Sequence, residues 1–187
     1  MSVSKDEASS ALQDIEATER RSRTLFGYGV ASPYLLMWGS LWLIAGTIGA
    51  VSPAHTGIGW GVVDIVGLLG TAYLIVRHAR RCGERSDRIH LLRYVGSAAA
   101  LAAFVGLTLM VFAPVKGVDV LMLFTLVAAA GYVVAGCWVG LRYSAVGVAL
   151  AGAAVGVFLL APAYLSLIVP FVGGAALILG GVWMRRA

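Results

Sequence analysis

The sequence predicts an all-α membrane protein: a bundle of six transmembrane helices arranged as three helical hairpins, preceded by a polar N-terminal helix. Three observations lead to this fold class. Of the 187 residues, 60% are hydrophobic and only 12% are charged, whereas soluble domains average about 45–50% apolar and about 25% charged residues. Apolar runs close to the roughly 20 residues that a spanning helix needs alternate with short polar segments. Basic residues gather at one end of successive runs, as the positive-inside rule describes.

The N-terminal part, residues 1–27, is a polar arm. Ser4 and Glu7 have the spacing of a capping box, which predicts that a helix begins there. Acidic residues precede basic ones by four positions along this helix, which is the favourable order for surface ion pairs. We therefore expect a cytoplasmic surface helix. The glycines of segment 27–29 are expected to form a hinge between the arm and the transmembrane domain, residues 28–187.

The transmembrane domain is predicted to contain six spans. They lie at about 31–52, 58–77, 94–114, 119–141, 144–161 and 164–184. Ser32 followed by Pro33 predicts the start of the first span, because proline suits the first position of a helix. With six spans, 13 of the 14 Lys and Arg residues lie on the side of the arm. Five spans would send Arg185 and Arg186 across, so the positive-inside rule favours six spans with both termini in the cytoplasm.

The segment 77–93 determines the direction in which the neighbouring spans run. Its six arginines are Arg77, Arg80, Arg81, Arg85, Arg88 and Arg93. A segment this basic cannot enter hydrocarbon, and short loops rich in Lys and Arg stay on the cytoplasmic side. We therefore predict a cytoplasmic basic loop that is attracted to anionic lipid headgroups.

The three predicted hairpins share a pattern. Each has a proline in its turn, at Pro53, Pro114 and Pro162, and a return span that ends in arginine, at Arg77, Arg142 and Arg185. The intervals of 24, 28 and 23 residues do not keep a strict register. An internal repeat, common among membrane proteins, and the ordinary make-up of helical hairpins both account for this pattern.

Asp64 is the acidic residue that lies clearly inside a predicted span. Insertion scales put the cost of a carboxylate at the centre of a helix at about 2.5–3.5 kcal/mol, so Asp64 should face protein or water. Thr47 and Tyr73 are its predicted hydrogen-bond partners. One interpretation is an intramembrane polar site for a proton, a cation or a substrate. The other is a structural carboxyl, protonated or snorkelling, that is bonded to a neighbouring span.

The sequence predicts neither an enzyme nor a metal or cofactor site. His78, Cys82 and His90 could supply three zinc ligands, but the surrounding arginines repel a cation and no paired ligand motif is present. The zinc-protease, nucleophile-elbow and P-loop signatures are absent. Both lysines lie outside the predicted spans, which excludes a Ser–Lys dyad within the membrane.

The 24 glycines predict close packing between helices. Helices associate in lipid through tight van der Waals contact, which small residues allow. Pairs of small residues four apart occur at Ala45 with Gly49, at Gly46 with Ala50 and at Gly152 with Gly156. A narrow path lined by small residues is the alternative.

The run from Trp38 to Gly46 (WGSLWLIAG), its continuation to Pro53 and the basic ends of the even-numbered spans resemble the HdeD-like acid-resistance membrane proteins. These are small bacterial inner-membrane proteins built as three helical hairpins. The segment 27–34 is also similar to uncharacterised bacterial membrane proteins. The charged arm is an addition to the HdeD-like pattern. The resemblance implies a non-enzymatic, stress-related membrane protein and supplies no site residues.

Two functions follow from these observations. The first is a non-enzymatic protein of the bacterial inner membrane, related to stress or acting as an interaction partner. A cytoplasmic protein would bind residues 1–27, and anionic lipid headgroups would bind the basic loop. The alternative is a small transporter or channel that uses Asp64. No nucleic-acid partner is predicted, because the basic residues are scattered among spans rather than forming one patch. A monomer and a small homo-oligomer both fit the sequence.

Overall fold

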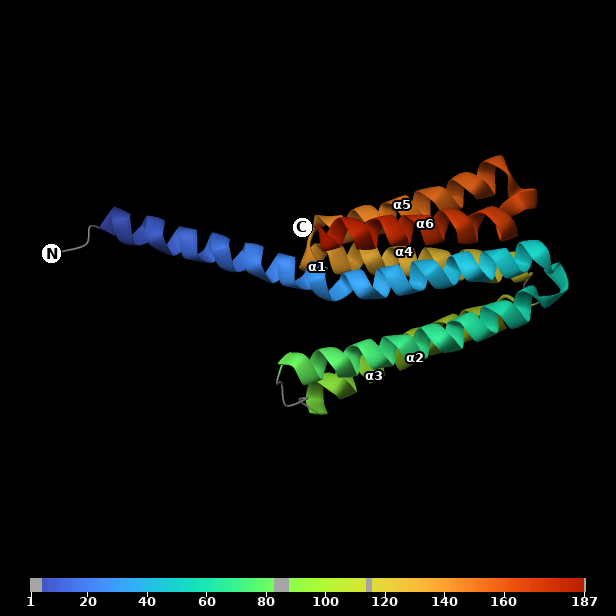
Figure 1. The fold of residues 1–187 in the computed structure, drawn as a ribbon, viewed down its shortest axis with the longest axis horizontal. Helices are drawn as coiled ribbons and strands as arrows, with labels where there is room; N and C mark the ends of the chain where they lie inside the picture. The colour runs from blue at the N-terminus through green and yellow to red at the C-terminus, as the bar shows by residue number, and fades with distance from the viewer. Residues whose placement is uncertain (1–4, 83–87, 114–115, 187) are drawn as a thin grey trace.

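The computed structural model describes residues 5–82, 88–113 and 116–186, and every regular element in them is helical. The elements are α1 (Lys5–Val51), the 3₁₀ turn η1 (Pro53–His55), α2 (Thr56–Cys82), α3 (Arg88–Val111), α4 (Gly117–Val139), α5 (Leu141–Leu160), the 3₁₀ turn η2 (Pro162–Tyr164) and α6 (Leu165–Arg185). Figure 1 shows their arrangement. The predicted all-α class is confirmed.

Five segments within these helices are long and apolar enough to cross a membrane. They are Thr24–Val51, Pro53–His78, Gly117–Val139, Leu141–Leu160 and Pro162–Arg185. In α3, the apolar part that lies within the described residues runs from Ala99 to Val111. The described chain therefore contains five candidate spans by length and composition.

The first helix, α1, runs for 47 residues without a break. Segment 27–29 is therefore helical, and the predicted helix start at Ser32 is wrong. A Cβ on Gly27 would lie 2.5 Å from Cγ1 of Val139, so this glycine permits close contact with α4. Pro33 lies inside the helix with an exposed ring. Figure 1 shows α1 changing direction where it enters the bundle.

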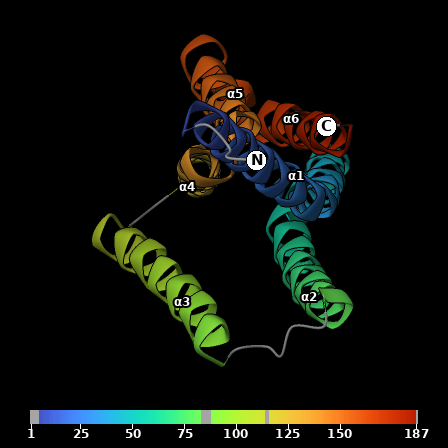
Figure 2. The same ribbon diagram turned by 90° about the vertical axis from the view of Figure 1, so that its left-hand side faces the viewer.

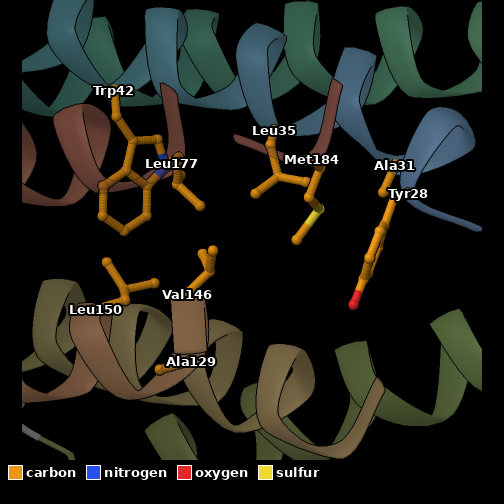
Figure 3. Close-up of a cluster of buried hydrophobic side chains, with 9 residues drawn as sticks. All are labelled: Tyr28, Ala31, Leu35, Trp42, Ala129, Val146, Leu150, Leu177 and Met184. Carbon is orange, nitrogen blue, oxygen red and sulfur yellow. The ribbon is translucent and has the colours of Figure 1, made fainter. Parts of the chain in front are cut away.

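Four helices, α1, α4, α5 and α6, form a packed unit that we call the four-helix body (Figure 1). Its core is a cluster of buried side chains from all four helices: Tyr28, Ala31, Leu35, Trp42, Ala129, Val146, Leu150, Leu177 and Met184 (Figure 3). Its α1 members run from Tyr28, where the arm enters the body, to Trp42, nine residues before the helix ends. The four-helix body therefore fixes the direction of the second half of α1.

Glycines bring α1 and α6 into backbone contact. A Cβ on Gly39 would lie 2.8 Å from the carbonyl oxygen of Gly174, and a Cβ on Gly174 would lie 2.8 Å from that of Gly39. Gly46 likewise packs against α6, as the small-residue pattern predicts. A Cβ on Gly152 or Gly156 would meet no atom within 4 Å. The prediction of close packing is therefore confirmed for Gly46 and wrong for the pair in α5.

The remaining helices are less tightly held. Val63 of α2 packs against Leu41 and Ala45 of α1. Most described side chains of α3 are exposed. Figure 2 shows α2 diverging from the four-helix body and α3 standing apart from it. The arrangement is therefore a four-helix body, from which α2 diverges and α3 stands apart.

Candidate functional site

A cavity of about 440 Å³ lies at the end of the molecule where the arm joins the four-helix body, between α1, α2 and α6. We call it the basic cavity. Its polar lining comes from Ser32 and Tyr34 of α1, Arg77 and His78 of α2, and Arg185 of α6. Val30, Leu36 and Leu74 supply an apolar wall. The cavity thus combines an apolar wall with cationic side chains from the ends of two helices.

The α1 side of the basic cavity has a fixed backbone geometry. The Ser32 hydroxyl is buried and donates a hydrogen bond of 2.8 Å to the Gly181 carbonyl of α6. Because proline has no N–H, Pro33 cannot donate the usual helical hydrogen bond to the Gly29 carbonyl. A Cβ on Gly29 would meet no atom within 4 Å. Gly29 therefore leaves open space in the lining.

The charges around the basic cavity are not neutralised by acidic groups of the described chain. Arg77 and Arg185 are exposed and form no ion pair with a described residue. The His78 ring is half-buried and lies 5.7 Å from the ring of Phe26, centroid to centroid. Two cationic groups beside a cavity with apolar walls create a positive potential there. The arrangement is suited to an anion that also carries an apolar part.

A second cluster at the same end surrounds Arg142, which lies in the first turn of α5. Its Nη1 donates a hydrogen bond of 2.8 Å to the carbonyl of Trp183 in α6. Its guanidinium carbon lies 5.0 Å from the Trp183 ring centroid and 5.3 Å from that of Tyr28. Both distances fall within the usual range of about 6 Å for a cation–π contact. Arg142 therefore joins α1, α5 and α6.

This cluster depends on the one-residue connection between α4 and α5. Gly140 has φ of 147°, a conformation that side-chain-bearing residues rarely adopt. A Cβ there would collide with the Tyr28 hydroxyl, which accepts a hydrogen bond of 3.3 Å from the Arg142 backbone N–H. Sequence analysis missed this cluster because it treated Arg142 only as the end of the span 119–141. The aromatic residues at neighbouring span ends, Tyr28 and Trp183, were the available signal.

The residues of the predicted intramembrane site do not come together. Asp64 is exposed on α2 and makes no hydrogen bond or ion pair with any described residue. The Thr47 hydroxyl donates to the Leu43 carbonyl of its own helix, at 2.7 Å. Tyr73 is exposed and lies nine residues after Asp64, so it projects from the opposite side of α2. The predicted hydrogen bonds to Asp64 are therefore wrong.

A different polar contact joins α1 and α2 further along α2. The Trp38 Nε1 donates a hydrogen bond of 3.1 Å to the Thr71 hydroxyl. Thr71 lies two helical turns after Asp64, on nearly the same side of α2. The polar side-chain contact between α1 and α2 is thus made by the Trp38 indole and the Thr71 hydroxyl, and not by the Asp64 carboxylate.

The basic loop is described only in part. Arg77 and Arg80 lie in the last turns of α2 with exposed side chains. Arg85 lies outside the described residues, as do the side chains of Arg81, Arg88, Arg93, Cys82 and His90. Among the described side chains, no three His, Cys, Asp or Glu residues gather as metal ligands would. The described part of the loop therefore contributes Arg77 and His78 to the basic cavity.

Comparison with protein-family models, with curated proteins and with solved structures finds no match to this chain. The resemblance of the first span to the HdeD-like proteins stays a prediction.

Proposed function

We propose that this chain is a non-enzymatic, six-span protein of the bacterial inner membrane that presents its N-terminal helix to a cytoplasmic protein partner. The observation that carries this proposal is the continuity of α1 from Lys5 to Val51. The second half of α1 lies in the four-helix body, and the first half projects beyond it (Figure 1). The proposed contact surface is thus continuous with a helix of the four-helix body.

Continuity makes the arm a rigid extension. At about 1.5 Å per residue, the part of α1 before Tyr28 reaches roughly 35 Å beyond the core. Tyr28, Ala31 and Leu35 hold its base in the core cluster. A partner that binds the arm would therefore be held at a set distance from the membrane, and a tilt of the arm would be transmitted to the packing of α1.

The sixth span in this proposal is α3. The end of α2 lies at the same end of the molecule as the entry of the arm, whereas α4 begins at the opposite end (Figure 1). The chain between them has to cover the same distance as a span, and α3 is the helix in that part of the chain. This supports six crossings, with both ends of the chain on one side of the membrane.

Cysteine labelling in intact cells tests the layout. In a chain carrying Cys82→Ser and Cys137→Ser, an impermeant thiol reagent should label Lys116→Cys from outside. Arg186→Cys should react only after the cells are permeabilised. If Lys116→Cys is protected, or if Arg186→Cys reacts from outside, the six-span layout is overturned.

Photo-crosslinking tests the contact surface. Ile15 is exposed on the arm, so a photoreactive residue at this position should capture a cytoplasmic protein. The same residue in place of Leu160, which is exposed at the opposite end of the body, is the matched control and should not capture that protein. Deletion of residues 1–24 from the otherwise unaltered chain should abolish co-purification of the captured protein and any associated stress phenotype. Unchanged partners and phenotype after the deletion would rule out the arm as the contact surface.

The second candidate function is a small transporter or channel that uses Asp64. The observation in its favour is the exposed carboxylate on α2, which no described residue pairs. An unpaired acidic residue inside a span is a functional-site hypothesis by default. In liposomes, Asp64→Asn should abolish proton-coupled or cation flux, whereas Asp119→Asn, at the start of α4, should leave it unchanged. Flux that survives Asp64→Asn excludes this mechanism.

A further inference from the structure

We infer that the basic cavity binds the phosphate headgroup of an anionic phospholipid, with Arg77 and Arg185 holding the phosphate. This inference rests on the proposed membrane location. It goes beyond general attraction to the membrane surface, because it assigns one lipid to one cavity. The two arginines come from the ends of α2 and α6, and both line the same space of about 440 Å³. Ligand-binding pockets are usually about 300–1,000 Å³.

The charge pattern matches a phosphate. A guanidinium presents a planar pair of N–H donors that fits phosphate oxygens, and such charge-assisted bonds are among the strongest in proteins. Neither Arg77 nor Arg185 forms an ion pair with a described residue, so both charges are available to a ligand. Diffuse attraction of a basic segment to headgroups requires no such convergence. Two unpaired arginines from separate helices line one cavity, which is the arrangement expected of a specific binding site rather than of a diffusely charged surface.

The backbone of α1 offers a complementary acceptor. Because Pro33 lacks an N–H, the Gly29 carbonyl does not receive its usual helical hydrogen bond. Both residues line the cavity. A hydroxyl of a glycerol-type headgroup could donate to this carbonyl while its phosphate meets the arginines. The cavity thus presents donors for the phosphate and an acceptor for the adjoining alcohol.

The apolar surroundings favour a lipid over a soluble phosphate ester. Val30, Leu36 and Leu74 form part of the cavity wall. Tyr73 and Val66 lie one and three turns before Arg77 on the same side of α2, and both are exposed. Acyl chains leaving the cavity would therefore lie along an apolar strip of the helix. A free phosphate compound would make no use of this surface.

Paired charge removal tests the site on the full chain in detergent. Binding of short-chain phosphatidylglycerol, measured by native mass spectrometry, should weaken about tenfold or more in Arg77→Gln/Arg185→Gln, because two charge-assisted contacts are lost. Arg80→Gln/Arg186→Gln is the matched control, since both arginines are exposed at the same helix ends and lie outside the cavity lining. It should change binding less than about twofold. If both double variants lose the same affinity for the lipid, binding depends on diffuse positive charge rather than on this cavity, and the inference is overturned.

Occlusion provides a test that leaves every charge in place. Gly29→Trp should fill the cavity and abolish binding, whereas Gly57→Trp, at another position where a Cβ meets no atom within 4 Å, should not. Unaltered binding in Gly29→Trp would place the lipid elsewhere. Glycerol phosphate should fail to displace the lipid at equal concentration, and displacement would instead assign the site to soluble phosphate esters. Because binding is measured in detergent, these results are independent of the cysteine-labelling test of membrane layout.

Discussion

The α1–α6 pair and the α2–α3 pair contrast within one molecule. Along α1 and α6, glycines on one helix meet the backbone of the other, as at Gly39 and Gly174. Along α3, a Cβ on Gly96 or Gly106 would meet nothing within 4 Å. Figure 2 shows the same contrast as a compact group of helices beside a separate α3. The structural role of a glycine in these helices therefore cannot be inferred until the surface that it faces is known.

The comparison also explains how the functional features are distributed. The four-helix body supplies rigidity, because glycine contacts, the Ser32 hydrogen bond and the Arg142 cluster all join α1 to other helices. The α2 helix rests on α1 through a smaller apolar contact around Val63. The basic cavity lies where these two regions meet, since it takes residues from α1, α2 and α6. Substitutions should therefore cost most in the body and least in the α2–α3 pair.

The largest effect is expected for Gly39→Leu. A Cβ at this position would lie 2.8 Å from the Gly174 carbonyl oxygen and 3.0 Å from the Ile178 backbone nitrogen, so α6 would have to move away. We expect the free energy of unfolding in detergent to fall by about 3 kcal/mol, as overpacking of a tight contact does. Gly106→Leu in α3 is the control and should leave stability unchanged or slightly higher, because glycine is a poor helix former. Equal costs at the two positions would remove the contrast between the regions.

Gly140→Ala should have the next largest effect. Its φ of 147° strains any residue with a side chain, at a cost of order 1–3 kcal/mol, and the added Cβ would collide with the Tyr28 hydroxyl. We expect about 2–3 kcal/mol of lost stability. Gly61→Ala in α2, where a Cβ meets nothing within 4 Å, should cost nothing. Thermal unfolding of both variants in the same micelles decides the matter, and a stable Gly140→Ala would contradict the tight connection between α4 and α5.

The outcome at individual glycines shows what could be predicted from the sequence. Apolar runs predicted the helical class and six spans, and five of these coincide with helical segments that are long and apolar enough to cross a membrane. The contact of Gly27 with α4 was not predicted, and the close packing predicted for Gly152 was wrong. Gly27 faces Val139, more than a hundred residues away, and Gly152 faces open space. Which surface a small residue meets is a tertiary property that a single sequence does not carry.

The candidate sites divide in the same way. Arg77 and Arg185 were both recognised as basic span ends, but their meeting at one cavity depends on how α2 and α6 lie against α1. The opposite placement of Asp64 and Tyr73 could have been found earlier, since nine residues of helix give half a turn of rotation. Helical phase was therefore available from the sequence, and helix adjacency was not.

A moderate effect is expected for Arg142→Gln. The change removes the charge that lies over the rings of Tyr28 and Trp183 and weakens the hydrogen bond to the Trp183 carbonyl. We expect a loss of about 1 kcal/mol, because the site is partly open to solvent. Arg80→Gln removes an exposed arginine from α2 and should produce no measurable change in unfolding. If the two substitutions lower the free energy of unfolding equally, the contacts of Arg142 do not stabilise the packing of α1, α5 and α6.

The smallest resolvable effect belongs to the Ser32 hydroxyl. It is buried and donates to the Gly181 carbonyl across the α1–α6 contact, so Ser32→Ala leaves that acceptor without its partner. Interhelical hydrogen bonds in membrane proteins average about 0.6 kcal/mol, and we expect a loss of that size. Thr108→Val in α3 also removes a hydroxyl, but one that bonds to the Phe104 carbonyl of its own helix, and it should change stability by less. Each variant and its control differ mainly in the surface that the side chain meets. If the loss of stability decreases from Gly39 to Ser32 while the controls stay unchanged, contact between helices, rather than residue type, separates the two regions.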